Sequence, residues 1–176
     1  MPPTARDALI AIAELLAPDV PDVADRVVGA HDDPLAYVQA HAEQLALRGI
    51  REPRPNLSWI ALVDALDDHG LCAEVDWKEM WEGVIAPLRR LRSWPTQPDA
   101  LAWADPANTE YDDLPTLEFL RLAGDRLRRA GTALAVVDID SDCYPLVLVP
   151  VTRAKELIDL ATIAGFGAYV FATSKS

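Results

Sequence analysis

The segment from Thr132 to Pro150 constrains the fold of this chain most. Two apolar runs, Ala133 to Val137 and Leu146 to Val149, stand on either side of a polar stretch. Short runs of aliphatic residues separated by turn-forming residues are typical of two strands joined as a β-hairpin. We therefore expect an antiparallel strand pair here, with the acidic segment Asp138 to Tyr144 as its turn.

The first half of the chain predicts helices. Thr4 and Asp7 have the pattern of a capping box ahead of a helix that Pro18 ends. Asp33 and Pro34 start another amphipathic helix, expected to run to Gly49 with Leu35, Val38, Ala42 and Leu45 on one stripe. After the connector 51–55, helices are expected from Asn56 to Gly70 and from Asp76 onward.

Short strands at Leu71–Val75 and around Ala168–Ala172 complete the expected sheet. The sequence thus predicts an α+β fold: a small, mostly antiparallel sheet of about four strands packed with about six helices, with a helical N-terminal half. A doubly wound parallel sheet is disfavoured because its regular β-α-β alternation is missing from the first half.

A length of 176 residues fits a single α+β domain spanning residues 1–176. Residues 94–114, rich in Pro, Asp, Asn and Thr, are expected to form a long loop, which is unusual inside a compact domain and often functional. Trp94 and Trp103 lie in this loop and could line a cleft or a protein-binding surface. Trp59, Trp77 and Trp81 are expected to anchor the core.

A formal net charge of −12 limits the partners of this chain. Nucleic acid and anionic membranes are repelled by such a field, so neither is expected to bind. The two cysteines, Cys72 and Cys143, have neither disulfide-scaffold nor zinc-finger spacing, and no signal peptide or 18-residue apolar stretch is present. A cytoplasmic location is therefore expected.

Common catalytic and cofactor motifs are missing. Neither a Gly-x-Ser-x-Gly elbow nor a phosphate-binding or dinucleotide-binding glycine pattern occurs, and His31, His41 and His69 have no recognisable catalytic partner. No cofactor is expected, and the sequence favours a non-enzymatic role.

Asp138, Asp140 and Asp142 form the first candidate site. On an extended chain these alternate residues point the same way, and clustered carboxylates suit hard cations such as Mg²⁺ or Ca²⁺. However, a calcium loop needs a glycine after its third acid, where this chain has Cys143. A solvated turn, or part of a binding edge together with Tyr144, is the competing interpretation.

Asp64, Asp68 and Glu74 form the second candidate site, with His69 beside them. On a helix, Asp64 and Asp68 share a face, and carboxylates grouped with a histidine can bind a metal or act as a general base. The competing interpretation is the ordinary solvated face of an amphipathic helix.

Three stretches carry a resemblance to a known family: Asn56-Leu57-Ser58-Trp59 with Asp64, then Val75-Asp76-Trp77-Lys78, and finally Asp138 to Pro150. In these stretches the chain resembles an uncharacterised bacterial family catalogued as a domain of unknown function, over about residues 40–172. The resemblance implies a bacterial α+β protein but no functional residues. Acidic single-domain proteins of this size are also similar to toxin-neutralising immunity proteins, in size and charge only.

Our leading hypothesis is an acidic protein-interaction module whose partner has a basic surface. The expected contacts are Asp138, Asp140, Asp142, Tyr144, Trp94 and Trp103. The alternative is a metal-dependent hydrolase that uses Asp138, Asp140 and Asp142, or Asp64, Asp68 and Glu74, to hold cations that activate water.

Overall fold

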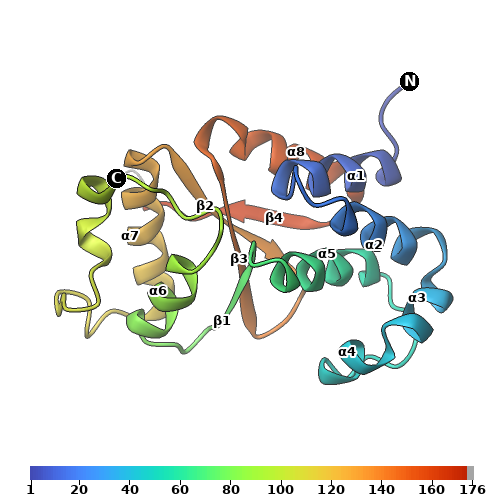
Figure 1. The fold of residues 1–176 in the computed structure, drawn as a ribbon, viewed down its shortest axis with the longest axis horizontal. Coiled ribbons are helices and arrows are strands. Elements are labelled where there is room, and N and C mark those ends of the chain that lie inside the picture. Colours follow the sequence, from blue (N-terminus) through green and yellow to red (C-terminus); the bar gives the residue numbers. More distant parts are fainter. Residues whose placement is uncertain (174–176) are drawn as a thin grey trace.

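A four-stranded antiparallel sheet with helices on both faces forms the centre of the molecule (Figure 1). The structure is a computed structural model and describes residues 1–173. The sheet has the order β1-β3-β2-β4, formed by β1 (Ala73–Asp76), β2 (Thr132–Asp138), β3 (Cys143–Pro150) and β4 (Gly167–Val170). The predicted α+β class, with a helical first half and about four strands, is confirmed.

Strands β2 and β3 form the predicted hairpin, in which Val136 lies opposite Leu146 and Thr132 opposite Pro150. The chain then passes through η2 (Val151–Arg153), a short 3₁₀-helix, and α8 (Ala154–Ala164) to place β4 on the free edge of β2. Gly165 ends α8 in the left-handed conformation, with φ 85°. Strand β1 pairs with β3 and forms the other edge.

One face of the sheet is covered by α1 (Ala5–Leu16), α5 (Leu57–Asp68) and α8, with α2 (Pro21–Asp32) packed against α1 and α5 (Figure 1). The predicted capping box of Thr4 and Asp7 is present at the start of α1. Side chains from alternate positions of β2 and β3, including Ala135, Val137 and Val147, form a core with these helices.

The opposite face is covered by α6 (Trp81–Arg89) and α7 (Thr116–Arg129). Leu134, Val136 and Leu146 point into this second core. The predicted long loop, residues 94–114, crosses the outer side of these helices and contains a 3₁₀-helix, η1 (Pro98–Ala104). Both faces of β2 are therefore buried, which explains its uninterrupted apolar sequence.

Two helix predictions were wrong in detail. The helix expected from Asp33 to Gly49 is two helices, α3 (Pro34–Ala40) and α4 (Ala42–Leu47), because the backbone of His41 between them, with φ −115° and ψ 26°, leaves the helical conformation. Leu35, expected on the apolar stripe of this helix, is 58% exposed. The helix expected from Asp76 starts at Trp81, because Asp76 accepts a hydrogen bond from the amide of Lys78 and closes a turn instead.

None of the helices within residues 1–173 is long and apolar enough to cross a bilayer.

Candidate functional site

The β2–β3 turn is held together by its own carboxylates and hydroxyl. Asp138 Oδ1 accepts a hydrogen bond from the amide of Asp140 at 2.9 Å, and Asp140 takes a left-handed conformation with φ 56°, which aspartate tolerates better than most residues. Ser141 Oγ accepts from the amide of Cys143 at 3.3 Å. These bonds give the acidic turn a defined shape at the end of the hairpin.

Strand β1 brings Trp77 to the same end of the sheet. Val75 pairs with Tyr144 and Asp76 with Cys143, and beyond them the amide of Trp77 donates to the carbonyl oxygen of Asp142 at 3.2 Å. A pocket of about 310 Å³ lies between Trp77 and the residues Ser141, Asp142, Cys143 and Tyr144. Trp77 is 51% exposed, so the prediction that it anchors the core was wrong.

The indole of Trp77 already contacts a cation from its own chain. The ammonium nitrogen of Lys78 lies 4.5 Å from the centre of the ring. An ammonium group at this distance is attracted by the electrons on the face of the ring. The exposed indole is therefore able to accept a positively charged side chain.

Two tyrosines extend this surface across the sheet. Tyr144 and Tyr169 both pack edge-on against buried Phe171, with ring centres 5.9 and 5.5 Å from it. Burial and the charge of Asp138 raise the pKa of Tyr169, although its side chain is 40% exposed. We use the name hairpin-tip surface for the residues that meet here: Trp77, Asp138, Asp140, Asp142, Tyr144 and Tyr169.

Trp94 and Trp103 lie elsewhere. Their rings are 6.5 Å apart, and Trp94 lines a pocket of about 400 Å³ with Arg89 and Leu101. Ser93, next to Trp94, lines a different pocket together with Pro150, at the end of β3 opposite the turn. Eight residues of strand separate these two ends by roughly 20 Å. The six residues proposed from the sequence therefore occupy two separate places.

The second acidic group is neutralised by arginines. Arg48 donates to Asp64 at 2.6 and 2.8 Å and also binds Glu74, while Arg26 donates to Asp68 at 2.6 Å. Asp64 and Asp68 share a face of α5 as predicted, but α5 packs on α2, and these two carboxylates are hydrogen-bonded by side chains of α2, of α4 and of Arg48 just after α4. Asp64 is only 3% exposed, so the prediction of a solvated face was wrong for this residue.

Burial raises the pKa of Asp64, and its hydrogen bonds and ion pair with Arg48 oppose that shift. One oxygen of the Asp64 carboxylate, Oδ2, has no hydrogen-bond partner within residues 1–173. Because arginines bind Asp64, Asp68 and Glu74, these carboxylates serve the packing of α5 against its neighbours. Arg48 was the one sign of this arrangement in the sequence, but its position in the chain does not reveal that it pairs with Asp64 and Glu74.

The metal-dependent alternative gains no support from side-chain positions. In the described part of the chain no three His, Cys, Asp or Glu side chains are grouped as ligands of one metal ion would be. That holds for the turn carboxylates as well as for Asp64, Asp68 and Glu74. Cys72 and Cys143 are free thiols, and burial raises the pKa of both, which disfavours the nucleophilic thiolate.

Comparison with protein families identifies a family for this chain. A family described as "Domain of unknown function (DUF6630)" matches residues 8–171. Searches of curated proteins and of solved structures found no match.

Proposed function

The chain belongs to the DUF6630 family, a domain of unknown function, and from this premise we propose that it recognises a partner protein with a basic surface through its hairpin-tip surface. The observation that carries the proposal is Trp77, a half-exposed indole beside an acidic turn. An immunity-like role, in which the acidic surface covers a basic toxin in the bacterial cytoplasm, is one form of this proposal.

Trp77 has the properties of an interface anchor. Moving a tryptophan side chain from water into an interface is strongly favourable. Ordering its two rotatable bonds on binding costs little entropy. Tryptophan and tyrosine are enriched among the few residues that dominate binding energies. Trp77, Tyr144 and Tyr169 supply three such rings within one surface.

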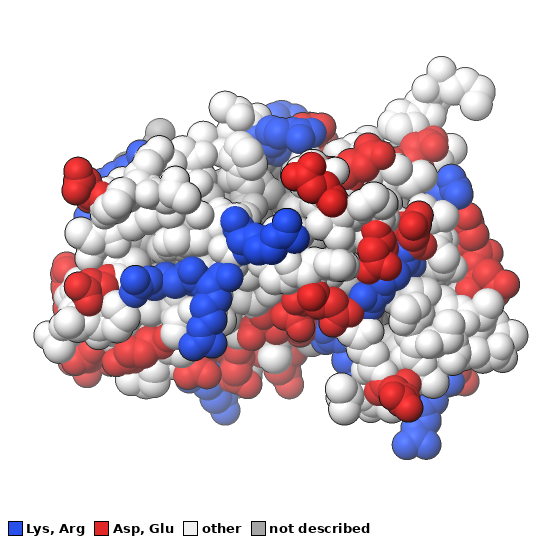
Figure 2. All heavy atoms as spheres, in the orientation of Figure 1, with Lys and Arg blue, Asp and Glu red and all other residues white. Residues whose placement is uncertain are grey.

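Charge supports a basic partner. Figure 2 shows acidic side chains along the lower left edge of the molecule, from the starts of α6 and α7 toward the β2–β3 turn. The formal net charge of −12 adds a long-range field of the same sign. Such a field speeds the approach of a basic protein and weakens as salt screens it.

The contact between Lys78 and Trp77 suggests how recognition works. In the free chain, the Lys78 ammonium occupies the indole face. A lysine or arginine of the partner, which could also reach the carboxylate of Asp142 in the same pocket, would gain both interactions in place of Lys78. The proposal therefore predicts a cationic side chain of the partner in this pocket.

Photo-crosslinking tests the proposal. A photoreactive phenylalanine analogue at Tyr169 is expected to crosslink a basic protein in a low-salt extract of the source cells, identified by mass spectrometry. The purified partner should bind the unlabelled chain, with affinity that falls as salt rises. Trp77→Ala should weaken binding at least tenfold, which is about the loss of 1.4 kcal/mol.

Trp94→Ala is the matched control, because it removes an indole at the opposite end of β3. Binding by Trp94→Ala should equal that of the unmodified chain. The proposal would be overturned by equal effects of the two substitutions, by crosslinks that persist in Trp77→Ala, or by a partner without a basic surface.

A further inference from the structure

Strand β4 forms one edge of the sheet, and within residues 1–173 no strand lies on its outer side. The order β1-β3-β2-β4 leaves β4 paired with β2 alone. The other element that packs closely on β4 is α8, the helix that leads into it. Gly167 is exposed, and so is Tyr169, at 40%. The outer main-chain groups of β4 therefore lie at an open edge.

The hydrogen bonds to β2 determine which groups of β4 point outward. The amide of Phe171 donates to the carbonyl oxygen of Leu134 on β2 at 2.9 Å. In an antiparallel ladder the residues that bond to one neighbour alternate with those that face the other side. Tyr169 therefore also bonds to β2, whereas Ala168 and Val170 direct their N–H and C=O groups away from it. The edge thus presents two donors and two acceptors in one row.

The two edges of the sheet differ in their protection. Natural edge strands are commonly blunted by charged side chains or proline, which hinder pairing with another chain. Strand β1, at the opposite edge, carries Glu74 and Asp76, and Arg48 binds Glu74. The sequence of β4, Gly-Ala-Tyr-Val, contains neither a charge nor a proline. Of the two edges, β4 is therefore the one suited to strand pairing.

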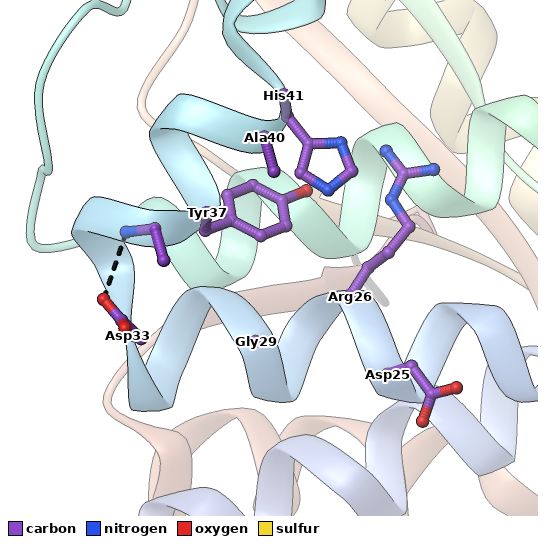
Figure 3. Close-up of a pocket in the computed structure, with 8 residues that line it drawn as sticks. Asp25, Arg26, Gly29, Asp33, Tyr37, Ala40 and His41 are labelled. Carbon is purple, nitrogen blue, oxygen red and sulfur yellow. Dashed lines mark hydrogen bonds between the residues drawn. The ribbon is translucent and has the colours of Figure 1, made fainter.

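The polar groups of the pocket between α2 and α3 are, by contrast, directed inward. Figure 3 shows the ring of Tyr37 lying across the space between these helices, with its hydroxyl directed toward His41 and Arg26. Tyr37 is only 5% exposed, and the terminal nitrogens of Arg26 donate to Asp68 at 2.6 Å and to Gln44 at 2.9 Å. These groups are used within the chain, whereas the outer groups of β4 face away from it.

We propose that β4 pairs antiparallel with β4 of a second copy of this chain, so that two four-stranded sheets join into one of eight strands. Ala168 of each copy lies opposite Val170 of the other. Each of these two facing pairs exchanges two backbone hydrogen bonds, four in all. A two-fold axis then passes between the two Tyr169 residues, as in a closed symmetric dimer.

A second copy is favoured as the occupant because this edge is complementary to itself. In the proposed register the two Tyr169 residues face each other in a position without backbone hydrogen bonds, where Cα atoms are about 4.5 Å apart and side chains are closest. Aromatic pairs across such a position stabilise a sheet. Each ring is already supported by Phe171, whose ring centre lies 5.5 Å away.

The net charge of −12 opposes the association of two copies, but little of it lies at this edge. The carboxylate whose charge acts on Tyr169 belongs to Asp138, on β2 opposite Gly167. In the dimer the two β2 strands lie three strand spacings apart, roughly 14 Å, which exceeds the screening length of about 8 Å at physiological salt. Added salt should therefore strengthen the dimer.

The dimer is independent of the basic partner proposed above. It covers Tyr169 but leaves Trp77, which follows β1 beyond β3 and β2, at the other edge of the sheet. The two associations also respond oppositely to salt, which weakens binding of a basic partner. Failure of one proposal therefore does not imply failure of the other.

Sedimentation equilibrium of the purified chain in 0.5 M NaCl tests the dimer. The average mass should rise from one chain to two with a dissociation constant on the order of 100 μM, because the interface is small. At low salt the dissociation constant should be higher. Hydrogen exchange measured by NMR reports the register: the amides of Ala168 and Val170 should gain protection as the concentration rises, while the amide of Tyr169, bonded to β2, should not.

Three variants locate the interface. Tyr169→Lys sets two ammonium groups opposite each other and should weaken the dimer at least tenfold, whereas Leu47→Lys, the same change of charge at an 89% exposed residue of α4, should not weaken it. Ala168→Pro removes an outward amide but none that bonds to β2, and should prevent dimerisation. If Ala168→Pro does not fold, Tyr169→Lys decides.

Three results would each overturn the proposal. The first is a single-chain mass up to about 1 mM in 0.5 M NaCl, ten times the expected dissociation constant. The second is a dimer that Tyr169→Lys leaves intact or that Leu47→Lys weakens equally. The third is concentration-dependent protection that does not include Ala168 and Val170.

Discussion

Asp64 depends on Arg48 for its charge at neutral pH. Since the carboxylate is buried and a single guanidinium binds it, Arg48→Ala leaves a charged group in a dry environment without its counter-ion. We expect this substitution to lower the free energy of unfolding by about 3 kcal/mol at pH 7, measured by urea denaturation.

Arg6→Ala is the control for this prediction. Arg6 pairs with Asp32 at 3.0 Å, but both side chains are nearly half exposed, so water replaces the lost partner. Stability should hardly change. Equal losses in the two variants would show that Arg48 is not specifically required.

His41 should make stability depend on pH. Burial lowers its pKa in the folded protein below the ordinary 6.5, so the unfolded chain takes up a proton first as the pH falls. Its contribution to stability is therefore complete above pH 6.5 and decreases as the pH falls below that value. Thermal unfolding of the intact chain and of His41→Gln between pH 7.5 and 5.5 should show a steeper decline for the intact chain; parallel curves would contradict the prediction.

Single side chains were the least predictable level. Trp77 follows a strand pattern and precedes an apolar helix. Its sequence context therefore gave no reason to expect it to be more exposed than the buried Trp81. What decides its exposure is long-range: the strand pairing places it beside Asp142, at the edge of the sheet. Likewise the buried Asp64 has its ion-pair partner in Arg48, 16 residues earlier in the chain.

Whole elements were predicted well where the determinants are local. The capping box at Thr4 and the two apolar runs of the hairpin each depend on a few neighbouring residues, and both lie where expected. The break at His41 was missed because the apolar spacing continues from α3 into α4. The backbone of His41, with φ −115° and ψ 26°, interrupts the helix there, and the periodicity of apolar residues does not record a change of backbone conformation at a single residue.

Two glycines in helices should respond oppositely to alanine. A Cβ at Gly124 in α7 would lie 2.1 Å from the carbonyl oxygen of Phe171, whereas one at Gly29 in α2 meets nothing closer than 3.9 Å. Alanine favours a helix over glycine by about 1 kcal/mol, so Gly29→Ala should raise the free energy of unfolding by up to that amount.

Gly124→Ala should lower the free energy of unfolding by about 1 to 2 kcal/mol, because the helical gain is smaller than the cost of moving α7 away from Phe171. Urea denaturation of the two variants measures both effects. Changes of the same sign would mean that α7 and the chain after β4 are not in close contact.

At the scale of the whole molecule, the arrangement of the sheet was beyond prediction. The sequence predicts the strands and the hairpin, but not that β4 pairs with β2 or that β1 pairs with β3. These pairings join segments as far apart as Glu74 and Pro145, and nothing in either strand specifies its neighbour. They nevertheless place Trp77 and Tyr169 on either side of the acidic turn, and so create the hairpin-tip surface.

The two cores should unfold together. Strands β2 and β3 give alternate side chains to both, so loss of the helices on one face exposes a strand surface that the other core needs. Each core contains one fully buried tryptophan: Trp59, stacked on Phe166 at 5.0 Å, and Trp81, packed edge-on against Tyr111 at 5.6 Å. These two indoles can report on the two sides of the sheet independently.

Labelling with 5-fluorotryptophan gives each indole its own ¹⁹F signal, which Trp→Phe substitutions assign. In a urea titration, the native signals of Trp59 and Trp81 should disappear at the same midpoint and with the same slope, as expected for one cooperative domain. A lower midpoint for Trp81 would mean that α6 and α7 detach while the sheet stays folded on α1, α5 and α8. Because both cores share β2 and β3, we expect no such intermediate. The signal of exposed Trp77 should follow the same transition, since the position of Trp77 depends on β1 and β3.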